Sequence, residues 1–369
     1  MKVNKRVGVR HFSLASAAVL AVGLGAAGTL GAAGTAGAAP STGLSQAGPS
    51  KGTGQFATAV VANDTLTITG TNGPDDISFA LNGSDPNTLD VDLDNNGFPD
   101  VQFDRSTFSA IAVFLQGGDD RFAVTGTSPD EALTVDGGSG NDTITSGSGN
   151  DLIFGGDGRD TINSGAGDDT IDAGSGDDAV VGGLGRDTAF LGSGRDSFVW
   201  NPGEGSDFVS GDSGYDTLVF NGAPGAEQMS LSPNGSRSVF LRQPGNVRMD
   251  LDGIQEVDLN ALGGADTFAV NDLSGTDITN VNVDLSVAGA GDKAADSVTV
   301  NGTDNRDRVH VEAERGRVDV EGLQAETRIT GSEPDFDHLQ VNTLGGRDKI
   351  RVDDGVSDQI KVDTDLGTI

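Results

Sequence analysis

Seven aspartates recur at nine-residue intervals in the middle of the chain, a spacing that can bring many carboxylates together. They are Asp142, Asp151, Asp160, Asp169, Asp178, Asp187 and Asp196. Carboxylate oxygens are preferred ligands of calcium, which takes about six to eight oxygens in flexible arrangements. The first chemistry that these residues indicate is therefore cation binding.

The aspartates belong to an uninterrupted array of nine-residue units from residue 137 to residue 199. Every unit has glycine at its second and fourth positions and aspartate at its sixth, and six of the seven have Ile, Val or Phe at the eighth, where Ala189 is the exception. Glycine adopts positive φ, turns the chain tightly and exposes backbone carbonyls as further oxygen ligands. The candidate carbonyl donors are Gly138, Gly140, Gly147, Gly149, Gly156, Gly158, Gly165, Gly167, Gly174, Gly176, Gly183, Gly185, Gly192 and Gly194.

Two looser units follow the array after the insertion Trp200-Asn201. They are PGEGSDFVS and GDSGYDTLV, and they place Asp207 and Asp216 at the sixth position. We expect both aspartates to take the same sixth-position role in cation binding as the aspartates of the array.

The last three residues of each unit predict a short strand whose eighth residue points inward. Two units then form one turn of a flattened coil, so each side chain meets its counterpart in the next unit but one. One edge carries Asp142, Asp160, Asp178 and Asp196, and the other carries Asp151, Asp169 and Asp187. Neighbouring turns lie about 4.8 Å apart, so each column of carboxylates repels itself unless cations lie between its members.

Calcium is the ion that suits this arrangement, because it accepts carboxylates mixed with backbone carbonyls. Magnesium prefers a tighter octahedron and retains its waters, and zinc prefers histidine or cysteine, which the repeats lack. Counting the gaps between successive aspartates on the two edges predicts about five bound calcium ions in the central array.

The array resembles the glycine- and aspartate-rich nonapeptide G-G-x-G-x-D-x-U-x of repeats-in-toxin (RTX, haemolysin-type) calcium-binding proteins. The resemblance covers 137–219, where four units depart from glycine at the first position, with Ser146, Ser164, Ala173 and Leu191. It implies an all-β fold, a right-handed parallel β-roll or calcium-binding nonapeptide solenoid, that folds only when calcium is present. It also implies that the repeat aspartates supply side-chain ligands and the turn glycines supply carbonyls.

The composition excludes several classes of protein. The 369 residues include no cysteine, which excludes disulfide scaffolds, cysteine-ligated zinc, iron-sulfur clusters and thiol nucleophiles. The formal net charge is −33 and the pI is about 4.1, so the chain cannot neutralise the phosphates of a nucleic acid. The expected partner is cationic or is bridged by cations.

The N-terminus predicts export. A basic start precedes an uncharged run of Ala, Gly, Leu and Val, and residues 1–38 are typical of a secretory signal peptide cleaved after Ala38, with an uncleaved anchor as the alternative. Residues 39–56 are rich in Pro, Ser, Gly and Thr and predict a flexible linker. We expect the mature protein to be secreted, extracellular or associated with the cell surface, and not inserted in a membrane after cleavage.

The flanks of the array are expected to be β-rich. An N-terminal segment (57–136) and a C-terminal repeat region (220–369) show period-2 strand patterns, parted by Gly, Asn or Pro. A phrase of Leu, Gly-Gly-x-Asp and an apolar residue recurs as LQGGDDRFAV, LGGADTFAV and LGGRDKIRV. The flanks are interpreted as solenoid- or sandwich-like extensions of the β-roll, and the repetition of this phrase favours the solenoid.

Other acidic groups lie in the N-terminal segment. The string DLDNNGFPD from Asp92 resembles the start of an EF-hand loop, but the twelfth position is Phe103 rather than glutamate. Residues 92–104 therefore form either a further calcium site or an acidic hairpin turn. The pairs Asp75-Asp76 and Asp119-Asp120 are interpreted as solvated loop charges, with a role as further ligands as the alternative.

No catalytic motif stands out, and we assign no catalytic residue. His310 and His338 lie in acidic strand-like segments without a serine or metal-ligand partner at useful spacing. The prediction is a secreted calcium-binding protein whose repeats fold on binding calcium, and which acts as an extracellular structural or adhesive module on a cell-surface or matrix polymer. The alternative is an extracellular enzyme that acts on a polysaccharide or protein polymer and carries a calcium-stabilised RTX module.

Overall fold

The computed structural model describes residues 45–46 and 57–367, which belong to one compact unit, Thr42–Ile369. The predicted signal peptide and most of the predicted linker lie outside the described residues. Within the described part the only helices are the short 3-10 turns η2 (Arg105–Thr107) and η3 (Val356–Asp358). None of the helices in these ranges is long and apolar enough to cross a membrane.

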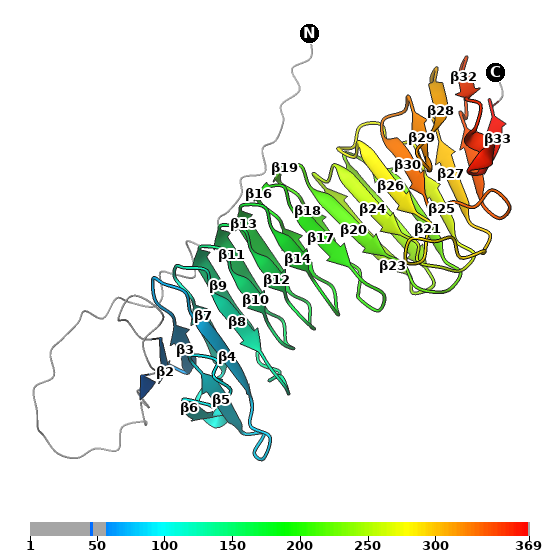
Figure 1. The fold of residues 1–369 in the computed structure, drawn as a ribbon. Helices are drawn as coiled ribbons and strands as arrows, with labels where there is room; N and C mark the ends of the chain where they lie inside the picture. The colour runs from blue at the N-terminus through cyan, green and yellow to red at the C-terminus, as the bar shows by residue number, and fades with distance from the viewer. Residues whose placement is uncertain (1–44, 47–56, 368–369) are drawn as a thin grey trace, which may run out of the picture. The chain divides into compact units, whose positions relative to one another are not determined.

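Two β-sheets make up the fold (Figure 1). The first has 18 strands. They are β1 (Ser45–Gln46), β2 (Thr58–Ala62), β3 (Thr65–Thr69), β7 (Ala110–Phe114), β9 (Leu133–Ser139), β11 (Leu152–Asp157), β13 (Thr170–Ser175), β15 (Thr188–Phe190), β16 (Ser193–Gly194), β18 (Phe208–Ser210), β19 (Ser213–Gly214), β21 (Gln228–Asn234), β22 (Arg237–Gln243), β23 (Val247–Asp252), β25 (Thr267–Val270), β27 (Ser297–Asn301), β31 (His338–Asn342) and β33 (Lys361–Asp365).

The second sheet has 15 strands. They are β4 (Asp76–Leu81), β5 (Thr88–Asp92), β6 (Val101–Asp104), β8 (Arg121–Val124), β10 (Thr143–Thr145), β12 (Thr161–Asn163), β14 (Ala179–Val181), β17 (Ser197–Trp200), β20 (Thr217–Asn221), β24 (Glu256–Asn260), β26 (Asn280–Asp284), β28 (Arg308–Glu314), β29 (Arg317–Glu321), β30 (Glu326–Thr330) and β32 (Lys349–Val352).

The repeat array forms a parallel β-roll with two units per turn. Successive units alternate between the sheets, and each strand pairs in parallel with the strand of the next unit but one, as Ile144 with Ile162 and Ile153 with Ile171. This confirms the fold expected for the array. Thr, Ile and Val suit such strands because β-branched side chains pack well on a pleated surface.

The eighth residue of each unit lies in the core, as the pattern predicts. These side chains are fully buried: Ile144, Ile153, Ile162, Ile171, Val180, Ala189 and Phe198. They join one apolar cluster that also includes buried side chains of both flanks, from Ala57 to Ile360. Each turn of the array therefore contributes few inward side chains to this core.

The solenoid continues through both flanks, as the repeated closing phrase indicates. On the N-terminal side β3, β7 and β9 pair in parallel, and so do β4 and β8. On the C-terminal side β20, β24, β26 and β30 pair in parallel, as do β21, β25, β27, β31 and β33. The division of the chain at residues 136/137 and 219/220 stays a prediction, because both sheets run across these positions.

Three antiparallel insertions interrupt the parallel order. They are β4–β5–β6, β21–β22–β23 and β28–β29–β30. The turns carry residues that adopt positive φ, such as Gly235 between β21 and β22 and Gly316 between β28 and β29. Each insertion lengthens the turn of the coil that contains it.

Candidate metal centre

The sixth-position aspartates form a hydrogen-bonded ladder along each edge of the β-roll. The backbone N–H of Asp142 donates to Asp160 Oδ1 at 2.8 Å, and the N–H of Asp160 donates to Asp178 Oδ1 at 2.8 Å. The same bond joins Asp178 to Asp196, Asp151 to Asp169, and Asp169 to Asp187. One carboxylate oxygen of each aspartate therefore accepts a hydrogen bond from the preceding turn.

The second carboxylate oxygen of these aspartates is buried and has no hydrogen-bond partner. This holds for Oδ2 of Asp142, Asp151, Asp160, Asp169, Asp178, Asp187, Asp196 and Asp216. These residues are at most 2% exposed. A buried carboxylate without compensation is costly, so each of these oxygens needs a proton or a cation.

Burial raises the pKa of these aspartates. The pKa of Asp160 is raised to about 6 and that of Asp178 to about 7, in both cases mainly by desolvation. The charges of neighbouring aspartates add to the shift, and the accepted backbone N–H opposes it. Without a cation the folded ladder therefore holds protons at a pH where isolated aspartates have lost them.

The turn glycines adopt the backbone conformation that the spacing predicts. Of the fourteen candidate glycines, all except Gly147 have positive φ, for example 115° at Gly156 and 136° at Gly176. The turns also stack closely, because a Cβ on Gly176 would collide with the carbonyl oxygen of Gly158 one turn away. Only glycine satisfies both conditions without strain.

Four of the seven units carry a side chain instead of glycine at the first position. Ser146, Ser164, Ala173 and Leu191 have no positive φ, and all four are buried. Ser164 Oγ donates to the carbonyl of Gly182 at 2.5 Å, and Ser146 makes the equivalent bond to Ser164. The departures from the family pattern therefore leave the turn intact.

The two looser units join the ladders. The N–H of Asp187 donates to Asp207 Oδ1 at 2.9 Å, and that of Asp196 donates to Asp216 Oδ1 at 3.0 Å. Bonded aspartates lie farther apart in the sequence here than within the array, because the loop after Trp200 absorbs the two-residue insertion. Asp216 in turn donates its N–H to Gln255 Oε1 at 2.6 Å, so a neutral amide ends this column.

The ladder also extends into the flanks, which the sequence patterns did not reveal. On the N-terminal side the N–H of Asp75 donates to Asp120 Oδ1 and that of Asp120 to Asp142 Oδ1. Both aspartates are buried, so the interpretation of these acids as solvated loop charges is wrong for Asp75 and Asp120. On the C-terminal side the same bonds join Glu227 to Asp266, Asp266 to Asp296, Asp296 to Asp337, and Asp307 to Asp348.

The loop at Asp92 gathers three carboxylates. Oxygens of Asp92, Asp94 and Asp100 lie within 4.8 Å of one another. The oxygens of Asp92 accept backbone N–H groups, including that of Gly97 at 2.8 Å, and Asp100 accepts the N–H of Leu93 at 2.8 Å. The loop joins the antiparallel strands β5 and β6, so the predicted hairpin turn is present, and the further calcium site stays a prediction.

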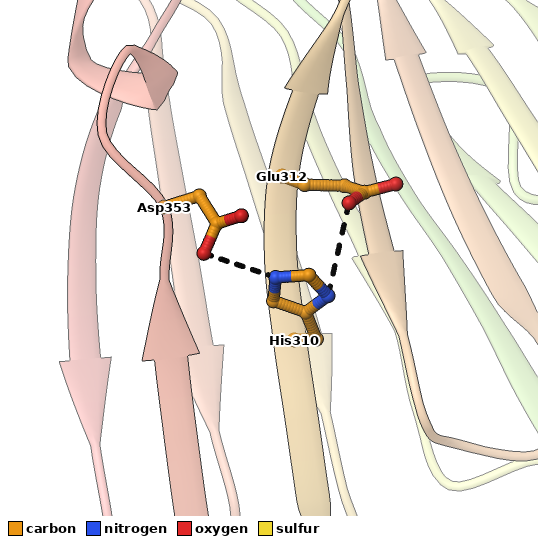
Figure 2. A group of neighbouring side chains, drawn as sticks. All are labelled: His310, Glu312 and Asp353. Atoms are coloured by element: carbon orange, nitrogen blue, oxygen red, sulfur yellow. Dashed lines mark ion pairs between the residues drawn. The ribbon is translucent and has the colours of Figure 1, made fainter.

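A second cluster lies at the C-terminal end of the second sheet. Figure 2 shows His310 between Glu312 and Asp353, with one ring nitrogen toward each carboxylate. His310 Nε2 lies 3.1 Å from Asp353 Oδ1, and Arg351 Nε lies 2.8 Å from the same oxygen. The His310 and Arg351 interactions hold the pKa of Asp353 below its usual range. Sequence reasoning missed this contact because parallel pairing of β28 with β32 brings together residues that are distant in the chain.

The arrangement at the array fits calcium. Unpartnered carboxylate oxygens and the backbone carbonyls of glycine turns are both hard oxygen donors, and histidine is absent from these turns. The aspartates at the sixth position of the units would supply the side-chain ligands. Calcium, when bound, supplies the positive charge that the buried carboxylates lack.

Comparison with known families agrees with this chemistry. Four segments match the RTX calcium-binding nonapeptide repeat, at residues 136–171, 154–189, 164–198 and 203–218. No curated protein matches the chain. The matched segments coincide with the stretch in which both edges of the β-roll carry a ladder. In this stretch most turns of the coil consist of two nonapeptide units.

Proposed function

We propose that this chain, which carries RTX calcium-binding nonapeptide repeats, is a secreted protein that folds on binding calcium. In this proposal it serves as an extracellular structural or adhesive module. The observation that supports calcium-driven folding is the pair of ladders with buried, unpartnered Oδ2 atoms. In this proposal, about five ions lie between successive turns of the array.

The physical basis of the proposal is the charge of the folded turns. Folding brings aspartates of like charge into adjacent turns and removes them from water, which opposes folding. Each turn contributes few apolar side chains to the core, so burial of apolar surface offsets little of that cost. Calcium binds only the folded arrangement and stabilises it by mass action.

The proposed ligands are the sixth-position aspartates and the carbonyls of the turn glycines. Asp207 and Asp216 are included, because their Oδ1 atoms continue the two ladders. Affinities of about 10⁻⁴ to 10⁻³ M are typical of extracellular calcium modules, so the array would fill where calcium is millimolar. The export signal predicted at 1–38 supports that location.

The proposed partner is a cell-surface or matrix polymer. A chain with a formal net charge of −33 does not attract an acidic polymer directly, but bound calcium can bridge carboxylates or sulfates to it. This part of the proposal is tested by pulling down acidic polysaccharide with the calcium-loaded protein and repeating the assay in chelator.

The experiment that tests calcium-driven folding is a calcium titration followed by far-ultraviolet circular dichroism. The purified chain is compared with the double variant Asp160→Asn/Asp178→Asn, and magnesium serves as the control ion. Asparagine keeps an oxygen that can accept the ladder N–H, so the substitution removes mainly the anionic ligand. We expect a cooperative rise in β signal that is specific to calcium and that needs at least about tenfold more calcium in the variant.

The matched control is Asp157→Asn/Asp177→Asn, which removes two exposed carboxylates from the same part of the array. It changes the net charge equally, so a general charge effect would move both variants together. A chain that is equally folded in chelator and in calcium would contradict the proposal. So would identical midpoints for the ladder variant and the control.

A further inference from the structure

Most ladder carboxylates fall into two kinds according to their second oxygen, and Asp207 and Asp296 belong to neither kind. In one kind this oxygen accepts the N–H of the residue four positions earlier. Asp75 accepts from Thr71 at 2.6 Å, Glu227 from Ala223 at 2.8 Å, Asp307 from Thr303 at 2.8 Å, and Asp337 from Glu333 at 2.6 Å. These carboxylates are satisfied within their own turn and need no further partner.

In the other kind the second oxygen is buried without a partner, and the backbone conformation explains why. The residues two and four positions before the aspartate adopt positive φ, as Gly156 and Gly158 do before Asp160. The N–H that would satisfy Oδ2 is then turned away. This pattern holds for nearly all of the matched repeats; before Asp151 only Gly149, two positions earlier, has positive φ.

The turn that ends at Asp266 belongs to this second kind, although it lies outside the matched repeats. Leu262 and Gly264 have φ of 67° and 111°, and Asp266 is 2% exposed with an unpartnered Oδ2. Positive φ is unfavourable for leucine, so the sequence pattern of glycines at both positions does not reveal this turn.

Further carboxylates surround Asp266. The N–H of Gly264 donates to Asp292 Oδ2 at 2.9 Å, which places that carboxylate against the turn. Asp296 Oδ1 accepts the N–H of Asp266 at 2.8 Å. Glu227 also lies beside Asp266, but it is paired with Arg242. Asp292 and Asp296 therefore add negative charge beside the buried oxygen that no arginine offsets.

From this geometry we propose a further divalent cation site, for calcium, at the turn 261–266 in the C-terminal region. Asp266 Oδ2 would be its buried ligand and Asp292 its more exposed one. All donors that the turn presents are oxygens, which favours calcium over zinc. The site goes beyond the proposed function, because the family match ends at residue 218.

Two other turns share part of this arrangement. Asp120 and Asp348 also have an unpartnered Oδ2 and positive φ at the residues two and four positions earlier. Asp120 is continuous with the array column, so its contribution cannot be separated from that of the repeats. Asp348 is not fully buried. The inference is therefore confined to Asp266.

The site is tested by counting bound calcium. The purified chain and its Asp266→Asn variant are dialysed to equilibrium against calcium, and the ions per chain are measured by elemental analysis. We expect the variant to bind one ion fewer. The matched control is Asp258→Asn, which changes a half-buried carboxylate on β24 away from the turns and should leave the count unchanged.

A second variant keeps the test decisive if Asp266→Asn does not fold. Asp292→Asn changes a partly exposed residue, and we expect it to weaken one site by about tenfold while the others keep their affinity. A folded Asp266→Asn chain with the full count overturns the inference, as does an Asp292→Asn chain with unchanged affinities. If Asp160→Asn/Asp178→Asn loses ions and Asp266→Asn does not, only this inference falls. If Asp266→Asn loses an ion and Asp160→Asn/Asp178→Asn does not, the proposed calcium sites of the array fall and this inference stands.

Discussion

At the scale of the residue, the decisive groups are carboxylate oxygens that folding buries without a partner. One oxygen of each array aspartate accepts a backbone N–H, and the other meets no donor; in six of the seven units the residues two and four positions earlier both have positive φ. Such an oxygen can be neutralised by a proton or by a cation, and these two ligands compete. The pH dependence of stability and the calcium affinity are therefore linked.

We expect the metal-free chain to lose stability as pH rises. The folded pKa of Asp178 is about 7 and that of Asp160 about 6, both above the ordinary value of 3.8. The folded state then binds more protons than the unfolded state between pH 4 and 7, so its free energy of unfolding falls as pH rises through this window. Far-ultraviolet circular dichroism of calcium-stripped protein at pH 4.5 and 7.5 checks this, with less β signal expected at pH 7.5.

The calcium-loaded chain should respond in the opposite sense. Protons must leave the ladder before calcium binds, so the calcium midpoint should move to higher concentration as pH falls from 7.5 to 5.5. Midpoints that do not change with pH would show that the ladder aspartates are not the groups that calcium engages.

The glycine at the fourth position of each unit should not tolerate a side chain. Gly176→Ala places a side chain at φ 136° and against the Gly158 carbonyl, so we expect a loss of about 2 kcal/mol or more of unfolding free energy in saturating calcium. Gly225→Ala is the control, since its φ is not positive and a Cβ there meets no atom within 4 Å. Equal denaturation midpoints for the two variants would contradict the proposed role of the turn.

The repeat pattern predicted the array well but missed its continuation. Glycine at alternate positions and an apolar eighth residue indicate both the turn and the inward strand, and the structure agrees at Ile144 and Ile162. Asp266 was missed because Leu262 takes the place of glycine, and sequence patterns do not report positive φ at a leucine. Asp75 was missed because its partner, Asp120, lies 45 residues away.

At the scale of the element, an aromatic stack joins the array to the C-terminal region. Trp200 of β17 stacks on Phe220 of β20 with ring centroids 4.2 Å apart, and Phe220 contacts Phe240 of β22, also at 4.2 Å. Phe240 in turn lies 5.8 Å from Phe268 of β25. The stack therefore links strands of both sheets at the place where turns of two nonapeptide units give way to longer ones.

We expect Phe220→Ala to destabilise the calcium-loaded protein by about 3–5 kcal/mol, because it removes a fully buried ring from the middle of this stack. Urea denaturation followed by the fluorescence of Trp200, the only tryptophan, measures the loss at the site itself. Phe98→Ala provides the control, since that ring is 76% exposed and should cost little. Matching midpoints for both variants would show that the stack does not couple the two regions.

The strands of the antiparallel hairpins can be predicted from the sequence pattern. The position of each hairpin in the coil cannot. Within 220–369 the period-2 patterns parted by Gly, Asn or Pro predict strands, and the structure forms the hairpins β22–β23 and β28–β29 there. Which sheet each hairpin joins depends on long-range parallel pairing, such as β18 with β23, which local alternation of side chains does not specify. The cluster of His310, Glu312 and Asp353 follows from the same kind of pairing.

At the scale of the whole molecule, the formal net charge of −33 opposes compaction. Salt screens that repulsion without filling the ladder. We expect the β signal of the calcium-free chain in far-ultraviolet circular dichroism to rise when sodium chloride is increased from about 0.05 to 0.5 M, where the Debye length falls to a few ångströms. In saturating calcium the rise should be much smaller, and an equal rise in both conditions would mean that bound calcium does not neutralise the ladder.

The ladder has a direction along the chain. Every N–H in it donates to a carboxylate that comes later in the sequence, from Asp75 to Asp120, onward to Asp216, and finally to the neutral Gln255. Each turn is thus completed by its successor, and the last one is closed by a group without charge. A polypeptide threaded outward from its N-terminus would acquire its turns vectorially, each new one acting as the template that locks the one before it.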